Sequence, residues 1–308
     1  MVYVPDAVNN TFAGFFNNNV LIIPKYQRGF SWEKPQILEF WSDLVQLPEG
    51  KIHYCGSILT KEREPELRSN SHSHVQQREI IDGQQRCACV YIILLAMRDR
   101  LNEIDGEVAL QLRETIDHDY LFFHPLEGQP DLRIKNETVD LHTFLWNLAN
   151  GHPSVPQVAP EQRILNSYEI FCKLLEDYDV QEISDIFYKI TTQMHSTEVY
   201  LDDQMDEPTV FESINNRGLS LSPMDQLKNY MILLADRCPE IDPDDMQFES
   251  HWFSGLERLM KKELHQRKDE NNMLAYYWIM HKQGTIGAEQ SKAFENFRVL
   301  EMKTIQQI

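Results

Sequence analysis

The chain has 308 residues, of which 42% are hydrophobic and 25% charged, so it can bury a sizeable core over about two domains. Its 29 basic residues stand against 48 acidic residues, and the net charge of −19 excludes a broad basic surface that coats duplex DNA. Any nucleic-acid or phosphate site must therefore be a local basic pocket on an acidic body.

Apolar runs and cysteines indicate the compartment. The longest apolar run, 87–97, is shorter than the ~18–20 residues of a membrane-spanning helix, and no secretory signal precedes it. The five cysteines are odd in number and contain no CxxC pair, which predicts reduced thiols in a cytoplasmic protein. His72 and His74 have no nearby cysteine partners, so their polar stretch is interpreted as a loop and not a zinc site.

The first hundred residues predict a small α/β domain. Short apolar runs predict strands over 20–23, 54–60 and 78–82, and helical spacing predicts a helix over 33–47 that Ser31 caps. Residues 66–77 are polar and predict a loop before the third strand.

A second helix follows the third strand and continues to about Leu101; it is apolar nearly all round, so we expect it to be buried. From about residue 107 the pattern is mostly helical. The sequence thus predicts an α+β fold with a nucleotide-binding domain over 1–102 and a helical domain over 103–308.

The segment Asp82-Gly-Gln-Gln-Arg86 joins the third strand to this buried helix. A glycine here lets a ligand approach the backbone, and the first helical N–H groups with an exposed Arg86 would bind an anion. Asp82, at the end of the strand, is placed to hold Mg²⁺. A tight turn capped by Asp82 explains the same residues, and this pattern alone does not choose between the two interpretations.

Two further polar segments offer similar groups. Tyr26, Gln27 and Arg28 lie in a loop between Pro24 and Gly29, where they could present a ring and phosphate ligands or simply pack.

Residues 208–216 predict a short helix that Gly218 ends, and a capped helix begins at Ser222. This corner displays Asn215, Asn216 and Arg217 either as caps or to a polar ligand.

Together these segments resemble the N-terminal domain of GmrSD-type restriction endonucleases. The resemblance rests on four ordered stretches: IPKYQRGFSW (23–32), YCGSIL (54–59), EIIDGQQR (79–86) and VFESINNRGLSLSPMDQLKNYMI (210–232). It implies a ParB/sulfiredoxin-like fold, nucleoside-triphosphate (NTP) binding and hydrolysis with Mg²⁺, and a role in prokaryotic defence against phage that carry modified DNA.

Residue by residue, the resemblance implies a catalytic set and a binding set. The catalytic set is Asp82, which also holds the metal, with Gln85, Arg86 and Arg28. The nucleotide-binding set is Tyr26, Gln27, Arg28, Gly83, Gln84, Gln85, Arg86, Asn215, Arg217 and Gly218. No residue is an obvious general base, and Glu79 and Glu212 are weak candidates, so we expect slow turnover.

The resemblance also implies partners. Many relatives continue into a His-Asn-His type nuclease domain, but this sequence contains no HxxP or comparable cluster, so a nuclease is expected on another domain or subunit. The basic segment 258–268 could touch modified DNA, or form a solvated helix face. A non-hydrolysing sensor of modified DNA or nucleotide is the main alternative. A sulfiredoxin-like or kinase activity is a third, although no cysteine lies in a motif that supports it.

Overall fold

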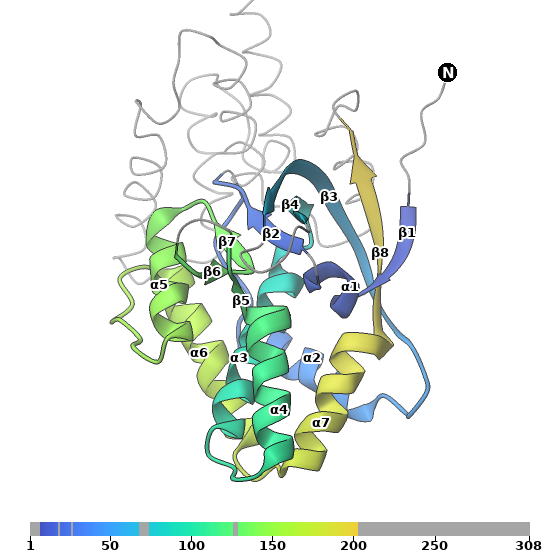
Figure 1. Ribbon diagram of the computed structural model, residues 1–308, viewed down its shortest axis with the longest axis vertical. Helices are drawn as coiled ribbons and strands as arrows, with labels where there is room; N and C mark the ends of the chain where they lie inside the picture. The colour runs from blue at the N-terminus through green and yellow to red at the C-terminus, as the bar shows by residue number, and fades with distance from the viewer. Residues whose placement is uncertain (1–6, 18, 26, 68–73, 126–128, 203–308) are drawn as a thin grey trace, which may run out of the picture. The chain divides into compact units, whose positions relative to one another are not determined.

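The chain divides into two compact units, Met1–Ser213 and Ile214–Ile308. The computed structural model describes residues 7–17, 19–25, 27–67, 74–125 and 129–202. The predicted α+β class is confirmed, because a mixed sheet combines with helices in this part of the chain (Figure 1). None of the described helices has the length and hydropathy needed to cross a bilayer.

A six-stranded mixed sheet organises the described residues. Its strands lie in the order β1 (Ala7–Thr11), β8 (Met194–Leu201), β3 (His53–Leu67), β4 (His74–Asp82), β2 (Asn19–Ile23) and β7 (Ile134–Asn136). β8 is antiparallel to β1 and parallel to β3, and β3 is antiparallel to β4. β2 is parallel to both β4 and β7.

This sheet takes strands from both sides of residue 102, the position predicted for a domain boundary. β7 and β8 come after that position, yet β7 pairs with β2 and β8 pairs with β1 and β3. The described residues beyond 102 therefore share one sheet with those before it, and the compact unit extends to Ser213.

The β3–β4 hairpin is longer than predicted. The loop expected over 66–77 is shorter in the structure, because β3 continues to Leu67 and β4 begins at His74. An ion pair lies across the hairpin next to this segment: Nε and Nη2 of Arg63 in β3 each lie 2.8 Å from Oε2 of Glu79 in β4. Such cross-strand ion pairs let a polar segment remain in a sheet.

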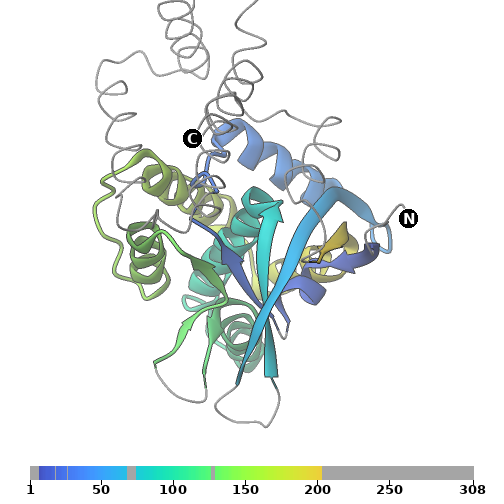
Figure 2. The ribbon, with the colours of Figure 1, turned by 90° about the horizontal axis from the view of Figure 1, so that it is seen from above.

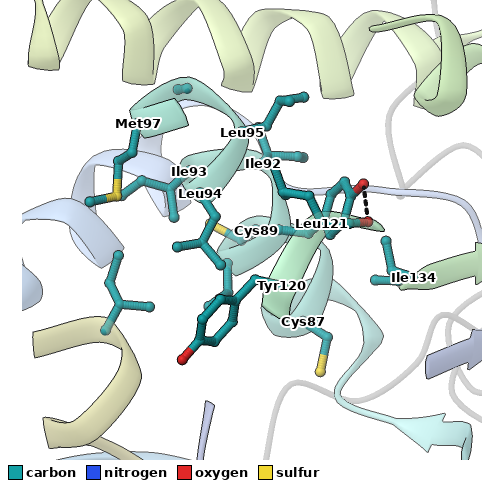
Figure 3. Close-up of a cluster of buried hydrophobic side chains, with 14 of the residues drawn as sticks. Cys87, Cys89, Ile92, Ile93, Leu94, Leu95, Met97, Tyr120, Leu121 and Ile134 are labelled. Carbon is teal, nitrogen blue, oxygen red and sulfur yellow. Dashed lines mark hydrogen bonds between the residues drawn. The ribbon is translucent and has the colours of Figure 1, made fainter. Parts of the chain in front are cut away.

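Helix α3 (Gln84–Leu101) lies at the centre of the core, and its predicted burial is confirmed. Every residue from Cys89 to Met97 is buried, and apolar side chains of this helix gather with Leu121 and Ile134 (Figure 3). The hydroxyl of Tyr91 donates a 3.1 Å hydrogen bond to the Leu121 carbonyl, which satisfies the polar end of a buried ring.

The remaining elements surround this core. They are α1 (Phe12–Phe16), α2 (Lys34–Gln46), α4 (Glu107–Ile116), η1 (Asp117–Leu121, π-helical), the two-stranded ladder of β5 (Phe122–Phe123) and β6 (Asp131–Leu132), α5 (Val139–Ala149), α6 (Ala159–Leu175), α7 (Val180–Tyr188) and η2 (Lys189–Gln193, π-helical). In Figure 2 the strands cross in front of α3, which packs on one face of the sheet through Ile58 and Ile80. The residue that caps α2 is Glu33 and not the predicted Ser31; its N–H donates to the side chain of Gln36 at 3.0 Å.

A buried carboxylate links four strands of the sheet. Glu198 of β8 is 1% exposed and accepts hydrogen bonds from Asn10 of β1 (2.8 Å), Thr60 of β3 (2.9 Å) and Arg78 of β4 (3.0 Å). The Tyr200 hydroxyl donates a further bond of 2.9 Å. Because three of these donors lie on β1, β3 and β4, the side chain of Glu198 connects all four strands on the side of the sheet away from β7.

Three parallel strands place the candidate site. β4, β2 and β7 are neighbours that run in the same direction, so their carboxyl ends lie at one edge of the sheet. The loop with Arg28 follows β2, the turn at Gly83 follows β4, and Asn136 ends β7. In open α/β sheets this edge is where ligands usually bind.

Candidate functional site

The structure brings together two of the three predicted segments, the loop after β2 and the start of α3. Gln27 is 8% exposed, and its Nε2 donates a 2.7 Å hydrogen bond to the carbonyl of Ile81 in β4. The side chain of Gln85 bonds back to the loop: its Oε1 accepts from the N–H of Ser31 at 2.7 Å, and its Nε2 donates to the carbonyl of Gly29 at 3.2 Å. These two glutamines brace the segments against each other, a positioning role that the residue types alone do not reveal.

Gly83 makes the turn from β4 into α3. Its φ of 97° and ψ of 3° are left-handed, and a Cβ at this position would lie 2.9 Å from Cγ1 of Ile58. Both the dihedral angles and the space therefore require glycine. The turn leaves the first N–H groups of α3 without intrahelical acceptors, as at any helix start.

Substitution of Gly83 by alanine is expected to lower the free energy of unfolding by about 1–2 kcal/mol for the left-handed backbone, with a further loss for the contact with Ile58. Gly50→Ala is the matched control, because Gly50 also has a positive φ, 68°, but a Cβ there meets nothing within 4 Å. Urea unfolding of both variants measures the difference. Equal losses in the two variants would show that the Ile58 contact has no energetic consequence.

Asp82 lies beside two arginines at the end of β4. Burial raises the pKa of its carboxyl, although Arg86, the N–H of Gly83 and Arg28 favour the charged form. Positive charge and a helix N-terminus thus surround one partly buried carboxylate. Arg86 and Arg28 are thus near enough to Asp82 to favour its charged form, and this is the grouping that a phosphate and metal site would need.

Arg86 is half-buried, which corrects the expectation of an exposed side chain. Its Nη1 donates to the carbonyl of Cys55 and its Nη2 to the carbonyl of Ser57, on either side of Gly56 in β3. The pairing of β3 with β8 shifts between Tyr54 and Ser57, and Gly56 has a φ of 88°. A Cβ on Gly56 would lie 2.8 Å from Nη1 of Arg86, so the guanidinium packs directly on this irregular turn of the strand.

A small cavity of about 30 Å³ adjoins these groups. Its polar lining consists of Arg28, Gln84, Gln85 and Asn136, and helices α5 and α6 supply apolar walls such as Leu145 and Ile164. Gly29 lets the loop close on these helices, because a Cβ there would lie 2.6 Å from Cγ of Pro160. The loop after β2 is thus held between α3 and the α5–α6 pair.

Asn136 is the residue at this edge that sequence reasoning missed. It ends a strand of only three residues, and no motif contains it. Its Oδ1 accepts from the N–H of Thr138 at 2.9 Å, while its own N–H lies 3.4 Å from Nδ1 of His142. The only signal in the sequence was its place after the alternating apolar residues Leu132 and Ile134 and before the helix that begins at Val139.

Several predicted residues fall outside the described part of the chain. They are Tyr26, Glu212, Asn215, Asn216, Arg217, Gly218 and the basic segment 258–268. Glu79, the other weak candidate for a general base, is described and is 9% exposed in its ion pair with Arg63. That pairing directs its carboxylate toward Arg63.

The donor set fits a magnesium ion that arrives with a nucleotide. Among the described residues, no three His, Cys, Asp or Glu side chains gather in a group that could hold a metal. Mg²⁺ commonly uses only one or two protein carboxylates together with substrate phosphates and water. Asp82 alone supplies that minimum.

The described cysteines near the site are protonated thiols. Burial raises the pKa of Cys55 and of Cys87 to about 12, so neither is a thiolate at neutral pH. This argues against a sulfiredoxin-like reaction, which would need a nucleophilic cysteine beside the phosphate.

Comparison with known proteins identifies the family. A search of curated proteins finds no match to this chain. The family profile described as "GmrSD restriction endonuclease, N-terminal domain" matches residues 10–232, which include both braced segments and the predicted site residues at 215–218. Because the match covers well over half of the chain, this protein belongs to the GmrSD restriction endonuclease N-terminal domain family, whose role lies in restriction.

Proposed function

We propose that this chain binds and hydrolyses a nucleoside triphosphate and thereby regulates a nuclease domain or subunit of a restriction system that acts against phage. The observation that supports the proposal is the bracing of the loop after β2 against the start of α3, beside Asp82, whose charged form Arg28 and Arg86 both favour. Family membership supports the link to restriction.

Phosphoryl transfer to water needs positioning and charge stabilisation more than covalent chemistry, and this cluster offers both. The N–H groups at the start of α3 and the guanidinium of Arg28 would bind phosphate oxygens, and Arg86 would add charge while it holds β3. Asp82 would hold Mg²⁺, which when bound neutralises charge on the phosphates. Gln27 and Gln85 would keep the two segments in register.

A non-hydrolysing sensor is the second candidate, and the ion pair between Glu79 and Arg63 favours it. With Glu79 engaged by Arg63, Asp82 is the carboxyl group whose charge Arg28 and Arg86 stabilise, and the proposal assigns it to the metal and not to proton transfer. Phosphate release over time separates the two candidates. Each NTP with Mg²⁺ should stabilise the chain thermally, and only the hydrolase releases phosphate above a no-protein control.

The variant Asp82→Asn is expected to retain NTP-induced thermal stabilisation in the absence of Mg²⁺ and to lose the additional effect of Mg²⁺. Its rate of phosphate release should fall on the order of 100-fold, because the amide cannot neutralise or hold the cation as a carboxylate does. Asp185→Asn, at an exposed position of α7, serves as the control for the substitution itself. Wild-type hydrolysis by Asp82→Asn would show that Asp82 only shapes the turn.

A further inference from the structure

Gln84 differs from the other glutamines of the site. It is 6% exposed and lines the cavity beside Arg28 and Asn136. Within the described part of the chain, no group forms a hydrogen bond with its carboxamide, whereas both amide atoms of Gln85 are bonded to the loop. The buried polar atoms without a partner in the described residues do not include those of Gln84, so its carboxamide is open to a molecule that enters the cavity and can form a hydrogen bond with it.

The size of the cavity limits what enters. Its volume of about 30 Å³ is room for about two water molecules, since one water needs roughly 10–15 Å³ by this measure. Pockets for organic ligands are far larger, typically ~300–1,000 Å³, so a nucleobase does not fit. The carboxamide can accept a hydrogen bond from a water and donate one to it.

The cavity also lies against the phosphate site. Arg28 lines it and acts electrostatically on Asp82, and Gln84 is the first residue of α3, whose N-terminus would bind the phosphates. A water held on the Gln84 carboxamide would therefore sit beside a phosphate bound by Arg28. Glutamine has this role in GTPases, where it orients the attacking water without taking its proton.

We infer that Gln84 holds and orients the water that attacks the γ-phosphate, an inference that rests on the proposed function. In the step, the water oxygen forms a bond to the γ-phosphorus and the bond from that phosphorus to the β–γ bridging oxygen breaks. The nucleoside diphosphate leaves with that electron pair. One water proton is retained by the released phosphate and the other passes to solvent, so Gln84 is unchanged.

The test is Gln84→Met in the full chain, which keeps the length of the side chain and removes the amide. We expect kcat to fall on the order of 100-fold, since misplacement of a reacting group has effects of this size. The NTP-induced rise in Tm should stay as in the wild type. Because an amide without a partner is replaced by an apolar group, the Tm without nucleotide should be unchanged or higher. Gln162→Met, at an exposed position of α6, is the matched control.

The outcomes separate this inference from the function on which it rests. Wild-type kcat in Gln84→Met overturns the inference and leaves the hydrolase intact. Loss of NTP-induced stabilisation in Gln84→Met also overturns it, because Gln84 would then bind the nucleotide itself. If the wild-type chain is stabilised by NTP but releases no phosphate, the proposed hydrolysis fails, and the inference fails with it. If Gln84→Met does not fold, Gln84→Asn, which keeps the amide but shortens its reach, should bind NTP normally and show a reduced kcat.

Discussion

Glu198→Ala is expected to lower the free energy of unfolding by about 3–5 kcal/mol, the usual result when one partner of a buried ion pair is removed. The substitution would leave the guanidinium of Arg78 without its buried carboxylate, and the side chains of Asn10 and Thr60 without their acceptor. Among the residues that the structure describes, Arg78 would keep Asn19 at 3.2 Å, a more distant Glu62 and the ring of Tyr200. Urea denaturation followed by far-UV circular dichroism gives the value.

Glu103→Ala is the control for loss of an acidic residue. Glu103 is 70% exposed in its side chain and pairs with Arg100 at 2.9 Å, so its removal should cost at most about 1 kcal/mol. Glu198→Gln, which still accepts hydrogen bonds, should fall between the two. A loss for Glu198→Ala no larger than that for Glu103→Ala would mean that the four-strand link contributes nothing to stability.

Arg86→Ala is expected to abolish NTP-induced stabilisation and also to lower the Tm of the chain without nucleotide. At 100 times the Kd, a ligand adds about 2.7 kcal/mol to the free energy of unfolding, and this increment should disappear. The second loss arises because Arg86 donates to the carbonyls of Cys55 and Ser57, which would be left without a charged donor. The sequence alone predicts only the first effect. Thermal shift with and without NTP measures both.

Arg100→Ala separates these two effects. Arg100 lies on the same helix, at its far end, and also donates to a backbone carbonyl, that of Tyr178 at 3.3 Å. Its removal should lower the Tm without nucleotide but leave the NTP-induced shift as in the wild type. Arg86→Lys keeps the charge yet cannot bridge two carbonyls as a guanidinium does, so it should recover part of the shift. A full shift in Arg86→Ala would exclude Arg86 from the nucleotide site.

The elements nearest the motifs were predictable because local patterns determine them. An all-apolar segment after Gly83 predicts a buried helix, and α3 is one. By contrast, β8 pairs with strands more than a hundred residues before it, and local sequence does not show which strands will be its neighbours. β7 has only three residues, which is too short for a recognisable alternation of apolar and polar residues. The boundary near residue 102 followed from the change to helical sequence, which carries no information about such distant pairing.

The membership of the site was more predictable than the role of each member. Arg28 and Arg86 both act on the charge of Asp82, because the parallel strands β2 and β4 end at one edge, and their use as a nucleotide site stays a prediction. The sequence could not show that Gln85 braces the loop whereas its neighbour Gln84 faces a cavity, since both are glutamines in the first turn of the same helix. Their direction depends on the path of the loop after β2, which is set by packing on α5 and α6.

Each hydrogen bond that braces the two segments requires a particular side chain at only one of its two ends. Gln27 and Gln85 form these hydrogen bonds with side-chain atoms, whereas Gly29, Ser31 and Ile81 form them with backbone atoms. Every residue type supplies a backbone carbonyl, and every type but proline supplies the N–H that is needed at position 31. A saturation library should therefore tolerate few residues at 27 and 85 and many at 31. Positions 81 and 29 are restricted for separate reasons, the burial of the Ile81 side chain in the core and the approach of Pro160 to Gly29. The bracing itself thus depends on the identity of two glutamine side chains, because the backbone atoms that they bond remain after most substitutions.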